Sequence, residues 1–177
     1  MLAQRRANVM EWPDASSYRD WDDQADCAWF RWKHPPTKSL MAEVRPLKIE
    51  YASQLWRWIF PTNEDILWLV AEKNKKSWLK KVFESEPVWF GRPMYPPLQE
   101  HLRRLFSWPD SETVFFLVRC GKCYQTPWRV YVEHPEDFLG CNDDGLLFHP
   151  TAREVAVFWE VSAMFVGRRS KRFLSKP

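Results

Sequence analysis

The spacing of the hydrophobic residues changes near the middle of the chain, from a helical period to short runs typical of strands. Between Leu47 and Phe60, apolar side chains recur at the spacing of one helix face. Pro61 ends this predicted helix, because proline has no N–H to continue it. The side chains on the predicted buried stripe are Ile49, Ala52, Trp56, Ile59 and Phe60.

Two further helices are predicted before the pattern changes. Ser77–Glu84 places apolar residues on one face and lysines on the other. Pro97 suits a first helical turn, and the apolar residues from Leu98 to Phe106 follow at helical spacing. Trp108–Ser111 has the composition of a turn and ends this third helix.

After Thr113 the sequence predicts strands separated by short links. Such links are too short for parallel crossovers, so neighbouring strands are expected to be antiparallel. The order of elements predicts an α+β domain, with N-terminal helices packed on a C-terminal antiparallel β-meander of about five strands. The predicted strands are Val114–Val118, Trp128–Val132, Leu146–Phe148, Val155–Val161 and Met164–Val166.

The length of 177 residues fits one domain, which is expected over residues 27–177 with a basic C-terminal tail. Residues 1–26 have no sustained period and are interpreted as an acidic, tryptophan-containing arm. Six acids and one base lie between Glu11 and Asp26, whereas residues 163–177 hold five bases and no acid. These ends are either two solvated termini or an arm that folds back onto the tail.

Tryptophan is the unusual component, with 12 residues against 12 Phe and 5 Tyr. Four of these residues lie on periodic apolar faces and are predicted to be core: Trp56, Trp78, Trp128 and Trp159. Tryptophan is also enriched at binding hot spots, so the four near the N-terminus are candidates for a partner-binding surface. These are Trp12, Trp21, Trp29 and Trp32. The alternative is that these tryptophans serve only as bulky filler of the protein interior.

Charge and targeting signals indicate a cytoplasmic protein. The formal net charge is only +3, and no apolar stretch is long enough to span a bilayer. The first residues lack the apolar core of a secretion signal, so no membrane association is expected and the four cysteines are expected to be reduced. A lysine run beside Trp68 and Trp78 is a candidate nucleic-acid surface or simply a solvated face: Lys73, Lys75, Lys76, Lys80 and Lys81.

One cysteine pair has the spacing of a zinc site. Cys120 and Cys123 are separated by two residues, Cys141 is a possible third ligand, and His134 or His149 a fourth. The competing interpretation is a strand end with a tight turn, in which Cys120 packs as a small apolar residue. No cofactor is expected other than this possible structural zinc.

A cluster of acids near a histidine is the candidate catalytic chemistry. His134, Asp137, Asp143 and Asp144 could act in acid–base catalysis or hold a divalent cation. The alternative is a helix start at His134–Asp137 and a turn at Asp143–Gly145. No phosphate loop, nucleophile elbow or zinc-protease helix is present, so an enzyme is not favoured.

Several short motifs, taken together, resemble a small bacterial family named domain of unknown function 2947. The resemblance covers about residues 27–172 and implies a single bacterial domain with a helical start and a sheet-rich end. It transfers no activity, cofactor or site residue. The motifs are Trp29-Phe30, Arg45-Pro46-Leu47, Gln54-Leu55-Trp56, Thr113–Phe116, Gln125–Val130, His134, Phe138-Leu139 and Asp143-Asp144-Gly145.

The sequence therefore favours a protein-interaction module whose partner is another protein. Small bacterial domains of this kind often neutralise toxins, so an immunity-type role is the narrower expectation, by analogy of fold. The alternatives are nucleic-acid binding by the lysine run and a metal-dependent enzyme using the His134 cluster.

Overall fold

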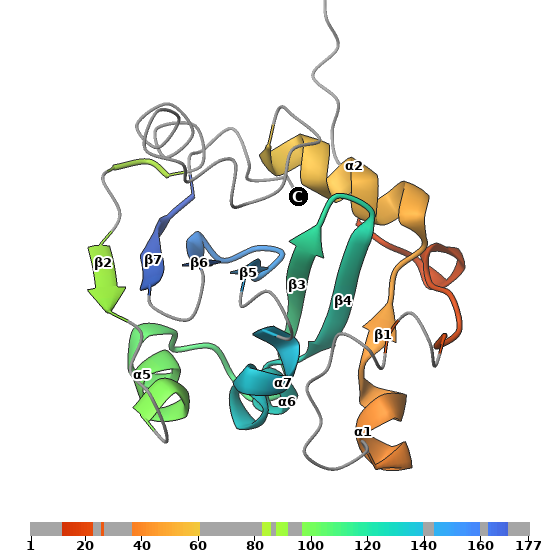
Figure 1. The fold of residues 1–177 in the computed structure, drawn as a ribbon, viewed down its shortest axis with the longest axis horizontal. Coiled ribbons are helices and arrows are strands. Elements are labelled where there is room, and N and C mark those ends of the chain that lie inside the picture. Colours follow the sequence, from red (N-terminus) through yellow and green to blue (C-terminus); the bar gives the residue numbers. More distant parts are fainter. Residues whose placement is uncertain are drawn as a thin grey trace, which may run out of the picture.

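The computed structural model describes residues 12–22, 26, 37–60, 83–85, 88–91, 97–139, 144–159 and 163–169 (Figure 1). The helices are α1 (Lys38–Glu43), α2 (Ile49–Ile59), α5 (Pro97–Leu105), α6 (Trp128–Glu133) and α7 (Pro135–Leu139), and a 3₁₀ turn spans Ala15–Ser17. The strands are β1 (Arg45–Pro46), β2 (Val88–Gly91), β3 (Thr113–Arg119), β4 (Lys122–Pro127), β5 (Gly145–Phe148), β6 (Glu154–Trp159) and β7 (Ala163–Arg168).

The described strands form a single seven-stranded sheet in the order β1-β4-β3-β5-β6-β7-β2. Every pairing in it is antiparallel. Four of the five predicted strands are confirmed as β3, β5, β6 and β7, and the α+β class is confirmed with them. β1, β2 and β4 were not predicted, so the sheet is wider than the expected meander.

Both faces of the sheet are covered, because successive residues of the central strands point to opposite sides. Phe115 and Leu117 pack with the buried stripe of α2. Val114 and Phe116 pack on the other side with side chains of α5, α6 and α7. In Figure 1, α2 lies across the top of β3 and β4, while α5, α6 and α7 lie toward the bottom. Burial on both faces explains why β3 is a continuous apolar run rather than an alternating one.

The helix α2 follows its prediction with one exception. Ala52, Trp56 and Ile59 are buried, as expected from their spacing. The expectation that Ile49 is buried was wrong, since 65% of its surface is exposed. Ile49 is the first residue of the helix and lies beside Gly121 in the β3–β4 turn, at the end of the sheet.

The strand predicted at Trp128–Val132 was also wrong, because this segment is α6. Alternating β-branched residues favour a strand, but Pro127 ends β4. The backbone N–H groups of the next two residues form hydrogen bonds outside the sheet. Trp128 N–H donates to the Glu112 carbonyl and Arg129 N–H to the Asp110 carbonyl. Burial of the helix against α5 and the sheet then overrides the weak local preference.

Other expectations have mixed outcomes. The helix start at His134–Asp137 is confirmed as α7, and the turn after Trp108 is confirmed before β3. Trp56 and Trp128 are fully buried core residues, as predicted. Most of the predicted helix Ser77–Glu84, including Trp78, lies outside the described residues, as does the side chain of Trp159. Within the described part of the chain, every helix is too short or too polar to cross a bilayer.

A substitution of Gly145 tests how closely the central strands β3 and β5 pack together. A Cβ at Gly145 would overlap the ring of Phe116, which is itself fully buried. We expect Gly145→Ala to lower the free energy of unfolding by about 1–3 kcal/mol in urea denaturation, the usual cost of overpacking a core.

A second variant identifies the clash as the cause. Phe116→Leu shortens the opposing ring, so Gly145→Ala should cost less in that background than in the wild type. An equal loss of unfolding free energy in the two backgrounds would contradict the close packing of Gly145 against the Phe116 ring.

Candidate functional site

The N-terminal segment, defined as Trp12–Asp22 together with Asp26, runs along the β1 edge of the sheet. Tyr18 forms an antiparallel bridge with Leu47. Arg19 N–H donates to the Pro46 carbonyl at 3.1 Å, and Lys48 N–H donates to the Ser17 carbonyl at 2.9 Å. These bonds use backbone groups at the outer edge of β1, and therefore cover an edge that would otherwise be open to another chain.

Two tryptophans attach this segment to opposite faces of the sheet. The ring of Trp12 stacks on Phe115, with centroids 5.8 Å apart, and meets Trp58 edge to face. The ring of Trp21 stacks on Tyr124 at 6.0 Å. Phe115 belongs to the core under α2 and Tyr124 to the core on the other face. The segment therefore crosses from one face of the sheet to the other.

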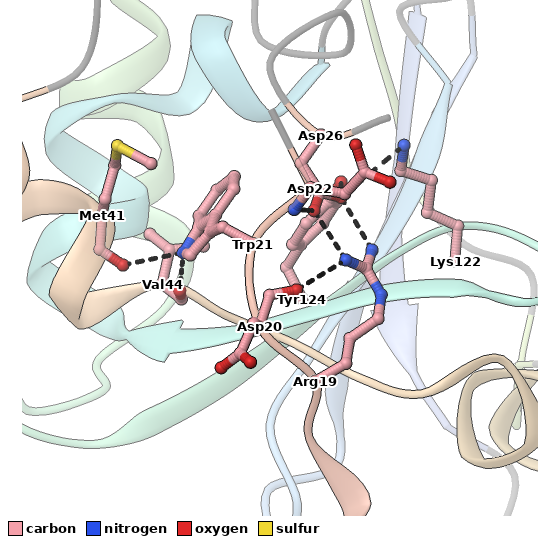
Figure 2. Close-up of polar contacts among 9 residues, drawn as sticks. All are labelled: Arg19, Asp20, Trp21, Asp22, Asp26, Met41, Val44, Lys122 and Tyr124. Carbon is pink, nitrogen blue, oxygen red and sulfur yellow. Dashed lines mark hydrogen bonds and ion pairs between the residues drawn. The ribbon is translucent and has the colours of Figure 1, made fainter. Parts of the chain in front are cut away.

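Asp26 is the polar centre that holds the segment in place (Figure 2). Its carboxylate has no exposed surface, and Arg19 binds it through both terminal nitrogens at 2.7 Å. The Tyr124 hydroxyl donates to the same carboxylate at 2.7 Å, and the Asp22 N–H donates at 2.9 Å. Lys122 Nζ lies 3.9 Å from Asp26 Oδ1. Trp21 points the other way, and its indole N–H lies 2.9 Å from the carbonyls of Met41 and Val44.

The hydrogen bonds decide the charge state of this cluster. Burial alone would raise the pKa of Asp26, but the bonds from Arg19, Asp22 and Tyr124 together lower it, so the carboxylate is ionised. Burial raises the pKa of Tyr124, and the adjacent Asp26 charge raises it further. Burial lowers the pKa of Lys122 to about 8, although the attraction of Asp26 opposes this change.

Two open clefts flank the segment at Arg19 and Asp20. The first, which we call the Trp21 cleft, has a volume of about 640 Å³ and includes Tyr18, Arg19, Asp20, Trp21, Met41, Arg45 and Lys48 in its lining. The second, the Lys122 cleft, has a volume of about 660 Å³ and is lined by Arg19, Asp20, Asp22, Ile49, Arg119, Cys120, Gly121 and Lys122. The N-terminal segment forms one wall of each cleft.

The cysteine pair lies at the β3–β4 turn, as the strand-end interpretation expected. Gly121 has a φ of +81°, which the tight turn requires and which glycine adopts without strain. Cys120 is half-buried near Ser53, whereas Cys123 is fully buried in the core under α2. Burial raises the pKa of the Cys123 thiol, which disfavours the thiolate that a zinc site needs.

His149 lies away from these cysteines. Cys123 pairs with Leu117 near the end of β3, while His149 follows β5 at Phe148, which pairs with Phe115. Its Nε2 lies 3.0 Å from Glu112 Oε2, and its Nδ1 accepts the N–H groups of Thr151 and Ala152. The structure therefore does not bring His149 to Cys120 and Cys123, and Cys141 lies outside the described residues.

The candidate catalytic acids are only partly brought together. His134 Nδ1 lies 3.5 Å from Asp137 Oδ2 at the start of α7. Burial raises the pKa of Asp137 and the neighbouring His134 lowers it, with a net rise. Asp144 is buried at the residue before β5, and Asp143 lies outside the described residues. Among the residues that the structure describes, no three histidine, cysteine or acidic side chains form a group that could hold a metal ion.

Of the remaining predicted site residues, some lie within the described part of the chain and the others lie outside it. Trp12 and Trp21 lie in the N-terminal segment and are half-buried. Trp29, Trp32 and the lysine run of Lys73, Lys75, Lys76, Lys80 and Lys81 lie outside the described residues, as does most of the basic tail.

Sequence reasoning missed the Asp26 cluster altogether. Its residues come from the presumed arm and from β4, and Lys122 and Tyr124 are close to Asp26 only in the folded chain. One local signal was present, since Arg19 is the single base among the six acids between Glu11 and Asp26.

We expect Asp26→Asn to lower the free energy of unfolding by about 2–3 kcal/mol at pH 7. The variant leaves Arg19 without its bidentate partner and weakens the bond from Tyr124, and removal of one partner from a buried pair is costly. Urea denaturation measures the difference. Asp20→Asn, an exposed change in the same segment, should cost less than about 0.5 kcal/mol. Equal effects of the two variants would contradict the role of Asp26.

The effect of Asp26→Asn should depend on pH in one direction. A lowered folded-state pKa gives stability that is present above the unfolded value of about 3.8 and is lost as the pH falls through the folded value. The difference between wild type and Asp26→Asn should therefore shrink as the pH falls below 4. A difference that grows toward low pH would show that Asp26 is not stabilised as a carboxylate.

Comparison with known proteins identifies the chain only at the level of a family. Searches of curated proteins and of solved structures give no match. A family model described as protein of unknown function (DUF2947) matches residues 23–167, which include Asp26 and all of the sheet except the last residue of β7. The match covers most of the chain and agrees with the resemblance of its motifs, and the chain therefore belongs to the DUF2947 family.

Proposed function

We propose that the chain is a cytoplasmic protein-interaction module that binds an acidic partner protein in the Trp21 cleft. The observation that carries the proposal is the chemistry of that cleft, which combines Trp21, Tyr18, Met41 and Arg45 around an open volume of about 640 Å³. Tryptophan, tyrosine, methionine and arginine are the residue types enriched in the cores of protein interfaces.

The aromatic side chains of the cleft are held in place before any partner binds. The Trp21 indole N–H is fixed by two carbonyl groups of the α1 region. The guanidinium of Arg45 lies over the ring of Tyr18, 3.6 Å from its centroid. Rigid side chains lose little entropy on binding, which favours a specific complex.

The charges in the cleft favour an acidic partner. Arg45 and Lys48 are exposed on its rim, and Arg19 adds a third positive charge that Asp26 largely compensates. Asp20 is the acid of the lining. A surface of this kind attracts carboxylates and repels basic chains.

Affinity purification with paired charge variants tests this proposal. Arg45→Glu with Lys48→Glu reverses the rim of the cleft, while Lys38→Glu with Arg57→Glu makes the same charge change at exposed residues outside the cleft lining. Quantitative mass spectrometry of proteins retained from the host lysate should show a protein that wild type and the control pair retain. The rim pair should lose that protein at least tenfold.

Two outcomes would contradict the proposal. One is an equal loss of the retained protein by the rim pair and the control pair, which would show a general effect of charge. The other is that the rim pair and the control pair retain the same set of proteins. Melting temperatures of the variants exclude unfolding as the cause. Neutralisation of a toxin is the narrower prediction from the sequence, and identification of the retained protein tests it.

A further inference from the structure

We propose that the Lys122 cleft is a binding site for a small anionic carbonyl compound, such as a 2-oxo acid or an aldehyde that carries a carboxylate. The amine of Lys122 would hold the ligand reversibly as an imine, with Arg119 on its anionic group. This site shares Arg19 and Asp20 with the lining of the Trp21 cleft, but it does not depend on the proposed interaction with a partner protein.

The position of Lys122 carries the proposal. Lys122 is the first residue of β4, and only 9% of its side-chain surface is exposed, yet it lines an open cleft of about 660 Å³. A lysine on a protein surface normally extends its charge into water, whereas Lys122 lies under the N-terminal segment beside Asp26. A largely buried lysine in the lining of an open cleft has the arrangement of a nucleophilic lysine.

Asp26 places a negative charge next to the amine of Lys122. Its carboxylate oxygen lies 3.9 Å from Nζ, which is too long for a hydrogen bond but close enough for strong electrostatic attraction. Both oxygens already accept bonds from Arg19, so Asp26 is fixed in position. A fixed negative charge beside Nζ stabilises a cation on that nitrogen, including the cation of a protonated imine.

The charge state of Lys122 suits such chemistry. Burial lowers its pKa to about 8; the charges of Asp26 and Asp22 raise it, and those of Arg119 and Arg19 lower it. Near neutral pH, a much larger share of Lys122 is then an uncharged amine than of a lysine with an ordinary pKa. An amine in this range is a usable nucleophile near neutral pH.

Arg119 supplies the contact for the anionic group. Arg119 pairs with Lys122 across the β3–β4 hairpin, just after a register shift in β3, and both residues line the Lys122 cleft. Arg119 is exposed and lines the cleft. A guanidinium binds a carboxylate through two parallel hydrogen bonds, and Lys122 lies next to the carbonyl of a ligand held in this way.

The covalent step balances without an oxidant or a reductant. The neutral amine attacks the carbonyl carbon and a C–N bond forms, while the π electrons move to oxygen, which takes the proton that the nitrogen gives up. The hydroxyl of the resulting carbinolamine takes a second proton from solvent and leaves as water, and the nitrogen lone pair forms the C=N bond. The sum is amine, carbonyl and one proton giving a protonated imine and water. The cation remains beside Asp26, and hydrolysis reverses the reaction.

Reductive trapping on the full chain tests the proposal. The protein is incubated with glyoxylate and cyanoborohydride at pH 7.5, and peptide mass spectrometry measures the rate of labelling at each lysine. Lys122 should be labelled at least tenfold faster than exposed Lys38 and Lys48 in the same molecule. The rate at Lys122 should reach half its maximum near pH 8.

Two variants separate the amine from the anion contact. Lys122→Met should remove the fast labelling and leave the rates at Lys38 and Lys48 unchanged. Arg119→Gln removes a charge that lowers the pKa of Lys122, so it should slow labelling by any aldehyde to some extent. The loss with glyoxylate should be at least threefold greater than the loss with acetaldehyde, which has no anionic group.

The comparison within the wild-type protein keeps the test independent of any folding defect in the variants. Labelling of Lys122 at or below the rate of Lys38 and Lys48 would overturn the proposal. Fast labelling of Lys122 with no preference for glyoxylate over acetaldehyde would overturn the role of Arg119 and the anionic class of ligand.

Discussion

A carboxylate with no exposed surface has to be compensated, and Asp26 is compensated by groups from two distant parts of the chain. Arg19 and the Asp22 N–H come from the N-terminal segment, while Tyr124 and Lys122 come from β4. The desolvation of one ion is recovered only if all of these groups meet it at once. The N-terminal segment and the β1 edge of the sheet therefore fold together. The aromatic contacts of Trp12 and Trp21 on opposite faces of the sheet add apolar burial to this arrangement.

Both candidate sites depend on this arrangement. Arg19 and Asp20 line both the Trp21 cleft and the Lys122 cleft. Without Asp26 in place, Lys122 would lose both its cover and its neighbouring charge, and the Trp21 ring would lose the segment that carries it. The two proposals are thus chemically separate, since one concerns an acidic protein surface and the other a carbonyl compound, but they rest on the same scaffold.

The sequence predicts the local elements of this protein better than its site. The stripe of α2 and the apolar run of β3 are local patterns, and both are confirmed. Trp128–Val132 has the alternation of a strand, and only the tertiary contacts of Trp128 and Arg129 with the preceding turn explain why it is a helix. The cluster at Asp26 was hidden for a related reason: Asp26 and Tyr124 are 98 residues apart, and nothing in a single sequence pairs a carboxylate with a hydroxyl at that distance. Ile49 fits its stripe, yet it is exposed because the sheet ends beneath it.

Amide hydrogen exchange tests most directly whether Asp26 holds the N-terminal segment on the sheet. The Arg19 and Lys48 N–H groups bond to carbonyls across the junction between the segment and β1, and the β3 amides of the central sheet serve as an internal reference. In Asp26→Asn, the Arg19 and Lys48 amides should exchange at least tenfold faster than in the wild type. The β3 amides should lose protection by no more than the fall in global stability of about 2–3 kcal/mol requires. Unchanged protection at Arg19 and Lys48 would contradict the account, because the segment would then be held by its other contacts alone.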